Sequence, residues 1–310
     1  MPDLRIIFMG TPDFAVPTLQ TLVENNYPVV AVITAPDKPA GRGLKLVQSP
    51  VKEYAVAQGI PVLQPPNLKA ETFLAELRSY QANLQIIVAF RMLPEVVWQM
   101  PALGTFNIHA SLLPQYRGAA PINWALINGE TETGVTSFFL RHQIDTGDML
   151  LQDKLTITPN DDFGTLYDKL KHAGAALGLK TVKAIAAGQV APQPQPNSHD
   201  LKEAPKIFKE NCEIKWDYPA SQIRNFIRGL SPYPTAWTML EGKTLKIFRA
   251  EVVPETPDLP TKPGTFTSDG KTFLHIATAN GQLSLTDLQL EGKKRMEIKE
   301  FLRGYRLKIE

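Results

Sequence analysis

A short stretch in the first half of the chain carries an amide and an imidazole at strand spacing. Asn107 and His109 lie two residues apart in Thr105–His109, a run typical of a buried strand. Side chains two apart in a strand point to the same face, so this pair can hold one carbonyl oxygen. A lone histidine on such a strand is more often a hydrogen-bonded core residue. The neighbouring asparagine, and the Arg117-Gly-Ala-Ala-Pro121 turn that follows, favour a functional site instead.

A carboxylate in a glycine turn completes the candidate set. Asp145 and Asp148 flank Thr146-Gly147, a pattern that by itself indicates an Asx turn or a helix cap. As a third member of the set, Asp145 would orient His109 and favour its cationic form. We therefore predict that Asn107, His109 and Asp145 are catalytic. Catalysis by these three side chains would require neither a metal ion nor a covalent enzyme intermediate.

The elements that must position these residues follow an alternating pattern. Strand-like runs at residues 5–9, 29–33, 85–89, 105–109 and 135–140 are separated by helix-like segments, and residues 163–187 have the spacing of a long helix. Such alternation predicts βαβ units and a mostly parallel sheet. Gly10 follows the first strand, but the other glycines of the dinucleotide-binding fingerprint are missing, which disfavours a nicotinamide cofactor.

The pattern changes in the last third of the chain. Ala191-Pro-Gln-Pro-Gln-Pro196 predicts an extended linker or a strap along the surface. Short strand-like runs between turns at 244–249, 272–276 and 282–285 predict a small barrel or sandwich. The predicted domains are therefore 1–188, a linker at 189–205, and 206–310.

Composition and charge exclude several classes of protein. The 310 residues carry 33 Lys and Arg against 31 Asp and Glu, a formal charge of +2. No apolar run approaches the roughly 18 residues of a membrane span. The single cysteine, Cys212, cannot form an internal disulfide, and no Cys/His cluster has zinc spacing. The start of the chain lacks the pattern of a signal peptide, so we expect a cytoplasmic protein with no membrane or metal partner.

Several motifs together resemble one enzyme family. These motifs are Met9-Gly-Thr-Pro-Asp-Phe14, Pro39-Ala-Gly-Arg-Gly43, Asn107-Ile-His109, Ser111-Leu-Leu-Pro-Gln-Tyr-Arg-Gly-Ala-Ala-Pro121, Asp145-Thr-Gly147 and Ile227-Arg-Gly-Leu-Ser-Pro-Tyr-Pro234. Over nearly the whole chain the sequence is similar to the methionyl-tRNA formyltransferase family. The resemblance implies an α/β fold with an N-terminal Rossmann-like parallel sheet domain and a small C-terminal OB-like β-barrel domain. It also implies formyl transfer from 10-formyltetrahydrofolate, the co-substrate, to the α-amino group of methionyl-initiator-tRNA, catalysed by a monomer.

The resemblance also assigns the folate site. It places the folate against Val88-Ala-Phe-Arg-Met-Leu93 and Ser111-Leu-Leu-Pro114, so the implied contacts are Val88, Ala89, Phe90, Arg91, Met92, Leu93, Ser111, Leu112, Leu113 and Pro114. Two stretches depart from the family pattern: Arg91 stands where relatives often have glycine, and Leu140-Arg-His-Gln143 precedes Asp145.

Contacts with tRNA are expected in two regions. The loop of residues 34–49 carries Arg42 and Lys45, which the resemblance assigns to the acceptor end. Residues 206–310 carry 17 basic against 13 acidic side chains, a bias compatible with nucleic acid but also with an ordinary solvated surface. The predicted contacts are Arg42, Lys45, Lys206, Lys209, Arg228 and Lys246, with Arg224, Lys243, Arg249 and Lys293-Lys-Arg295 as further candidates.

Three alternative functions share this set of residues. A formyltransferase could act on another amine, such as a nucleotide sugar or glycinamide ribonucleotide, because the catalytic residues meet only the folate and the amine. A formyltetrahydrofolate hydrolase would use water in place of the amine. A non-catalytic RNA-binding protein could use the same scaffold, but the intact Asn107, His109 and Asp145 set disfavours it.

Overall fold

The computed structural model describes residues 3–40, 45–196, 199–253 and 262–306. The chain forms two compact units, neither of which is one continuous stretch. The first comprises Met1–Gly118, Thr133–Thr156 and Tyr167–Glu203, and the second comprises Ala119–Glu132, Ile157–Leu166 and Ala204–Glu310.

The first unit is built on a seven-stranded sheet with the order β10-β9-β7-β6-β1-β2-β5. Its strands are β1 (Ile6–Gly10), β2 (Val29–Ile33), β5 (Val62–Leu63), β6 (Leu84–Val88), β7 (Thr105–His109), β9 (Glu132–Phe139) and β10 (Met149–Thr156). The five strands from β7 to β5 pair in parallel, as the sequence predicts. β9 instead runs antiparallel to β7, so the sheet is mixed at this side.

The strand register aligns the end of β7, which carries the predicted catalytic residues, with the ends of β6 and β1. Gly10 of β1 pairs with Val88 of β6, and Val88 pairs with Ile108 of β7. The carboxyl ends of parallel strands meet at one edge of a sheet, where ligands bind in open α/β folds. The fold therefore places Asn107 and His109 at the edge that such proteins use for binding.

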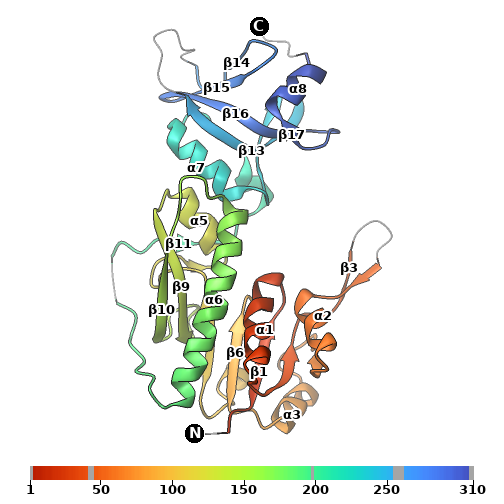
Figure 1. Cartoon of the computed structure of the whole chain (residues 1–310), viewed down its shortest axis with the longest axis vertical. Helices are drawn as coiled ribbons and strands as arrows, with labels where there is room; N and C mark the ends of the chain where they lie inside the picture. Colours follow the sequence, from red (N-terminus) through yellow and green to blue (C-terminus); the bar gives the residue numbers. More distant parts are fainter. Residues whose placement is uncertain (1–2, 41–44, 197–198, 254–261, 307–310) are drawn as a thin grey trace. The chain divides into compact units, whose positions relative to one another are not determined.

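Helices cover both faces of the central strands, whose residues are fully buried. The helices of this unit are α1 (Val16–Glu24), α2 (Pro50–Ala57), α3 (Glu71–Ser79), α4 (Glu95–Trp98) and most of α6 (Phe163–Ala186), together with the short 3-10 helix η1 (Asp13–Ala15). Ile7 and Met9 of β1 share a core cluster with Leu74 and Leu77 of α3. On the other face, α1 and α6 run side by side along the sheet (Figure 1).

A glycine allows α6 to approach both the sheet and α1. An ideal Cβ on Gly178 would lie 2.8 Å from Ile108 Cδ1 of β7 and 3.0 Å from Thr18 Cγ2 of α1. Farther along the helix, the Thr181 hydroxyl donates to Ser137 Oγ of β9 at 2.8 Å. These contacts pack α6 against β7, the strand that carries Asn107 and His109.

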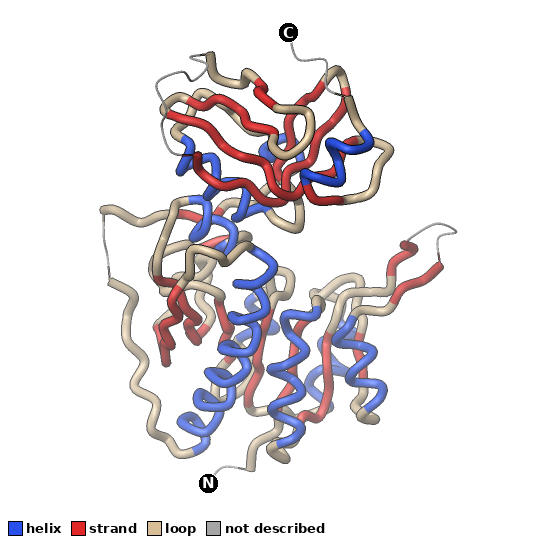
Figure 2. Tube along the Cα trace, turned by 45° about the horizontal axis from the view of Figure 1, so that its top comes forward, coloured by secondary structure: helices blue, strands red, loops and turns tan. Residues whose placement is uncertain are grey.

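The second unit is built on an antiparallel sheet that curls into a half-barrel. Its strands are β12 (Ala236–Leu240), β13 (Lys243–Val253), β14 (Phe266–Ser268), β15 (Leu274–Thr278), β16 (Gly281–Leu290) and β17 (Met296–Glu297). The β13–β16 pairing shifts register around Arg249, and such irregularities bend a sheet. Figure 2 shows these strands as a curved layer, and the concave core holds Ile223 and Ile227 of α7 (Ala220–Leu230). α8 (Ile298–Gly304) and η2 (Lys209–Cys212) complete this unit.

Two segments from within the predicted first domain, residues 119–132 and 157–166, belong to the second unit. α5 (Pro121–Ile127) packs on α7, where the Asn123 amide donates to the Gly229 carbonyl at 2.8 Å. Residues 157–166 join them, and the Gly164 amide donates to the Ser231 carbonyl at 3.1 Å. The predicted boundaries at 188 and 205 stay a prediction, but a continuous division of the chain does not describe these contacts.

The proline-rich segment lies along the first unit. Gln193 and Met149 exchange two backbone hydrogen bonds, of 2.8 and 2.9 Å, which attach the segment to β10. We call residues 191–196 the proline strap. The remaining short strands are β3 (Lys38–Ala40) and β4 (Lys45–Val47), which form an antiparallel hairpin, β8 (Arg117–Gly118) and β11 (Glu203–Ala204).

Candidate active site

Asn107 presents a side-chain amide at the site, and its oxygen has no hydrogen-bond partner in the described part of the chain. It lies in β7 beside Ile87 of β6 and Phe138 of β9, and its side chain is half-buried. Its Oδ1 atom is buried and has no hydrogen-bond partner among the described residues. A buried polar atom without a partner costs free energy unless something binds it, so this amide oxygen is available to a donor group of a ligand.

His109 faces an acceptor on each side of its ring and forms a hydrogen bond with one of them. Its Nε2 lies 2.8 Å from the Tyr116 carbonyl oxygen, which can only accept, so Nε2 carries a proton. Its Nδ1 lies 3.7 Å from Asp145 Oδ2, with both side chains largely buried. That distance is too long for a direct hydrogen bond but suits an ion pair when the imidazole is charged.

Asp145 occupies a constrained turn. Its φ of 53° is in the left-handed region, which surrounding contacts must maintain. Its Oδ2 accepts a 3.0 Å hydrogen bond from the Gly118 amide, and its own carbonyl accepts one of 2.8 Å from Gln195 Nε2. An ideal Cβ on Gly147 would collide with the Phe139 carbonyl oxygen, so this turn packs directly on the end of β9.

The structure thus brings His109 and Asp145 together, with Asn107 on the same face of β7 as His109. The arrangement offers an amide to polarise a carbonyl oxygen, an imidazole beside a carboxylate, and a carboxylate that can receive a proton. These are the groups that acyl transfer to an amine requires. The catalytic assignment of the three residues stays a prediction.

The residues that the family resemblance assigns to the folate site differ in their exposure to solvent. Val88, Leu93, Ser111 and Leu113 are buried, so these four residues offer little surface to a ligand. Ala89, Arg91 and Met92 are exposed, and Phe90, Leu112 and Pro114 are partly exposed. Ala89 has a φ of 47°, which turns the chain outward directly after β6.

The two stretches that depart from the family pattern make specific contacts. The Arg91 guanidinium donates to the carbonyl oxygens of Pro65 and Pro66. His142 pairs with Glu95, with 3.1 Å between Nε2 and Oε1, and its ring lies edge-on to Trp98. His142 therefore connects the turn before Asp145 to the start of α4.

The predicted acceptor-end loop is only partly described. Arg42 lies outside the described residues, and Lys45 is the first residue of β4, paired with Ala40. Directly before the hairpin, Asp37 Oδ2 accepts a hydrogen bond of 2.6 Å from Lys52 Nζ, which also donates to Gln64 Oε1 at 2.8 Å. The hydrogen bonds from Lys52 and Gln64 hold the pKa of Asp37 below its usual value. This cluster anchors the start of the hairpin.

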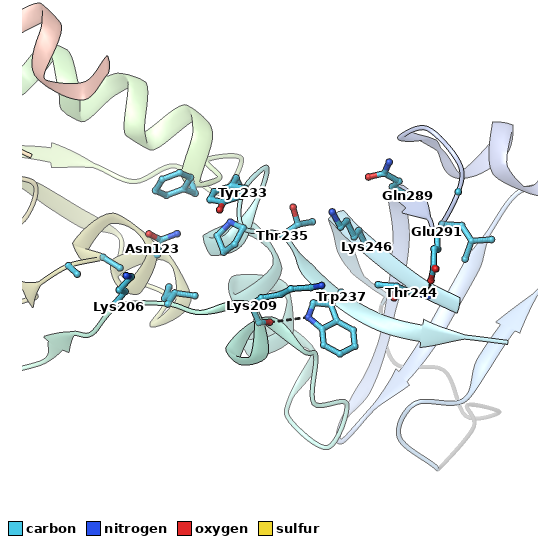
Figure 3. A pocket seen from close by; sticks show the side chains of 17 residues that line it. Asn123, Lys206, Lys209, Tyr233, Thr235, Trp237, Thr244, Lys246, Gln289 and Glu291 are labelled. Carbon is cyan, nitrogen blue, oxygen red and sulfur yellow. Dashed lines mark hydrogen bonds between the residues drawn. The ribbon is translucent and has the colours of Figure 1, made fainter. Parts of the chain in front are cut away.

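Three of the predicted tRNA-binding lysines meet in a cleft of the second unit. Lys206, Lys209 and Lys246 line a cleft of about 820 Å³ (Figure 3). Tyr233, which is 76% exposed, and Trp237 line the same cleft, and Trp237 Nε1 donates to the Lys209 carbonyl at 3.2 Å. We call this the lysine cleft. Cations beside exposed aromatic rings are typical of surfaces that bind single-stranded nucleic acid.

Arg228 does not line the lysine cleft, and its guanidinium is hydrogen-bonded to other residues of the protein. Its guanidinium donates to Asn225 Oδ1 at 2.8 Å and to the carbonyl oxygens of Thr158 and Asp161, each at 3.3 Å. Burial, and then the positive charge of Arg224, lower the pKa of Arg228. These contacts give Arg228 a structural role in holding residues 158–161 against α7.

Most of the further cationic candidates in this unit also have partners. Arg224 and Arg249 both pair with Glu251 at 3.1 Å, and Arg295 pairs with Asp287. Lys243 and Lys293 are exposed, and Lys294 is 3.9 Å from Glu300. The lysine cleft is therefore the better described candidate for tRNA contact.

Sequence reasoning missed three groups at these sites. The Tyr116 carbonyl and the Gly118 amide are backbone atoms, which no side-chain pattern reveals. Gln195 was part of a segment predicted only as a linker or strap. Tyr233 stands in a family motif, but its exposure beside the lysines depends on the fold.

None of the helices in the described part of the chain is both long and apolar enough to cross a membrane. Within the same residues there is no group of three or more His, Cys, Asp or Glu side chains that could hold a metal ion.

Comparison with known proteins identifies the family. The formyl transferase model matches residues 4–182, and the model of the formyl transferase C-terminal domain matches residues 206–306. A methionyl-tRNA formyltransferase from Bacteroides fragilis is 55% identical over 98% of this chain and 96% of its own length.

Two solved structures share the fold at low sequence identity. An N-formyltransferase from Helicobacter canadensis, in complex with folinic acid and dTDP-3-aminofucose, has a TM-score of 0.65 at 19% identity, covering 91% of this chain and 98% of its own. A methionyl-tRNA formyltransferase from Clostridium thermocellum has a TM-score of 0.56 at 14% identity, covering 81% and 94%. With both family models and a relative of this identity in agreement, the chain belongs to the methionyl-tRNA formyltransferase family.

Proposed function

We propose that this protein transfers a formyl group from 10-formyltetrahydrofolate to the α-amino group of methionyl-initiator-tRNA. The observation that carries the proposal is the 55% identity to a methionyl-tRNA formyltransferase over 98% of the chain. The Asn107 amide, on the same strand face as His109, and the His109–Asp145 pair supply groups suited to this chemistry.

The three residues would act on different parts of the reaction. The bound co-substrate supplies an activated formyl group. Asn107 then donates its amide N–H to the formyl oxygen, where negative charge develops as the amine attacks. His109, held by the Tyr116 carbonyl, contributes positive charge beside Asp145. Asp145 accepts the proton that leaves the amine, directly or through a water molecule. The tetrahedral adduct then collapses as the bond between the formyl carbon and the folate nitrogen breaks, and that nitrogen takes up the proton and leaves as tetrahydrofolate.

The folate would lie against the exposed face of residues 89–92. Ala89 and Met92 are exposed there, directly after the buried end of β6. The buried side chains of Val88 and Leu93 lie at either end of this segment and anchor it to the core of the unit.

The tRNA would use the lysine cleft and the β3–β4 hairpin. In the cleft, Lys206, Lys209 and Lys246 would neutralise phosphates, and Tyr233 offers a ring on which a base can stack. Contacts to phosphates position a nucleic acid without reading its sequence. We propose a monomer that works in the cytoplasm, where initiator tRNA is used.

A substrate comparison tests the proposed function. The purified protein is given 10-formyltetrahydrofolate together with charged initiator tRNA, charged elongator tRNA, a nucleotide amino sugar, glycinamide ribonucleotide or buffer alone. We expect rapid formylation of methionyl-initiator-tRNA and slow release of formate in buffer. Faster transfer to one of the small amines, or formate release at the same rate without an amine, would replace the proposal with the corresponding alternative.

A further inference from the structure

Gln195 links the proline strap to the Asp145 turn. Its Nε2 donates to two backbone carbonyl oxygens of that turn, Asp145 O and Gly147 O, each at 2.8 Å. Its Oε1 accepts from Arg117 Nε at 3.0 Å and from the Arg117 terminal nitrogen at 2.6 Å. One half-buried amide therefore joins three segments that are distant in sequence.

The partners leave only one orientation for this amide. Backbone carbonyls can only accept hydrogen bonds and a guanidinium can only donate them, so Nε2 must face the turn and Oε1 must face Arg117. Glutamate could keep the contact with Arg117, but it would place an oxygen against two carbonyl oxygens. Glutamine is thus the side chain of this length that satisfies both sides.

The same turn is held from a second direction. The Gly118 amide donates to Asp145 Oδ2 at 3.0 Å, directly beside Arg117 in β8. Asp145 has a left-handed φ of 53°, which needs support from its surroundings. Its backbone is supported by Gln195 and its carboxylate by Gly118, and both supports connect to Arg117-Gly118.

The strap is suited to holding Gln195 in place. Pro194 and Pro196 flank it and restrict the backbone, so less backbone conformational entropy is lost when the strap is ordered. The backbone of Gln193, two residues before Gln195, is hydrogen-bonded to the backbone of Met149 in β10. Met149 lies four residues after Asp145. The strap is therefore attached to the strand that follows the catalytic turn.

We propose that Gln195 is a positioning residue that sets the place of the Asp145 carboxylate relative to His109. The inference rests on the proposed catalytic role of Asp145. It assigns the proline strap to the catalytic apparatus, in addition to its role as a connection. A displacement of about 1 Å in a catalytic group can cost about 10²-fold in rate, so loss of the two donated hydrogen bonds should reduce turnover.

Two substitutions at Gln195 and one matched control test the inference. Gln195→Glu keeps the Arg117 contact and removes both donors, and Gln195→Met removes all the polar contacts. Gln193→Glu makes the same change of charge in the same strap, at an exposed side chain whose backbone carries the attachment to β10. We expect kcat for formylation to fall about 10–100-fold in both Gln195 variants, with KM for folate and tRNA and the melting temperature close to those of Gln193→Glu.

A double-mutant cycle shows whether Gln195 acts through Asp145. If it does, Gln195→Met should lower kcat in the wild-type background and have little further effect in Asp145→Asn. Multiplicative effects would overturn the inference, as would a wild-type kcat for Gln195→Glu beside an impaired Asp145→Asn. A wild-type kcat for Asp145→Asn would overturn the proposed role of Asp145 itself, and the inference with it.

Discussion

At the scale of single residues, the imidazole of His109 is the group whose role is most directly tested. Its Nε2 is engaged by the Tyr116 carbonyl and its Nδ1 faces Asp145, so it has little freedom to move. We predict that His109→Ala lowers the single-turnover rate of formylation by about 10²–10³-fold, the usual cost of losing a group that stabilises developing charge. Rapid-quench measurement with pre-bound folate would determine the rate.

The control for this substitution is another histidine. His172 lies exposed on α6, so His172→Ala should retain the wild-type rate. Equal single-turnover rates for the two variants would remove His109 from the catalytic set.

The surroundings of Tyr167 predict that the free energy of unfolding depends on pH. Its hydroxyl donates to Asp13 Oδ1 at 2.5 Å, and burial followed by this hydrogen bond raises the pKa of Tyr167 well above its usual value. Above about pH 10 the unfolded chain loses this proton while the native protein keeps it, so the unfolding free energy falls as the pH rises. Tyr167→Phe should cost about 1–2 kcal/mol at neutral pH, and the difference from wild type should shrink at about pH 11.

Urea unfolding at the two pH values measures this difference. Tyr218→Phe, at an exposed tyrosine, provides the comparison for general alkaline effects. A difference between wild type and Tyr167→Phe that stays constant with pH would mean that Tyr167 titrates alike in the folded and unfolded states.

At the scale of elements, the turn after β9 depends on a glycine. A Cβ on Gly147 would collide with the backbone carbonyl of Phe139, which cannot move without disturbing β9. We predict that Gly147→Ala lowers the unfolding free energy by about 1–3 kcal/mol and displaces Asp145, so that kcat falls as well. Gly304→Ala, at a helix end with no atom within 4 Å, should change neither the melting temperature nor kcat. Retention of both properties by Gly147→Ala would show that the turn can relax without moving Asp145.

At the scale of the whole molecule, tRNA binding should depend on the lysine cleft. Replacing Lys206, Lys209 and Lys246 with alanine removes up to three phosphate contacts, so the slope of log K against log salt should become shallower by about 2–3. Filter binding across salt concentrations would measure that slope. Three exposed lysines outside the cleft, Lys215, Lys271 and Lys299, give a control variant of equal charge. The same slope change in both variants would indicate only a general effect of net charge.

The sequence by itself determined the central strands of the first unit, the long helix α6 and the catalytic candidates, but it did not locate β10 or α7. Periodicity located β2 and β7 at their observed bounds and α6 to within one residue, because apolar spacing directly reflects which faces are buried. Asn107 and His109 were found because residues two apart share one face of a strand. Asp145 was found through its glycine turn and the family motif.

Only the tertiary structure decided which groups surround those residues. The Tyr116 carbonyl, the Gly118 amide and Gln195 reach His109 and Asp145 from up to 50 residues away, and backbone atoms carry no side-chain signal in a sequence. The same holds for α5, whose buried Ile122, Ala125 and Leu126 belong to the second unit although they precede β9. Removing the chain beyond about residue 204 would thus expose α5. Local patterns record how each segment is buried, whereas which segments bury one another is set by long-range packing.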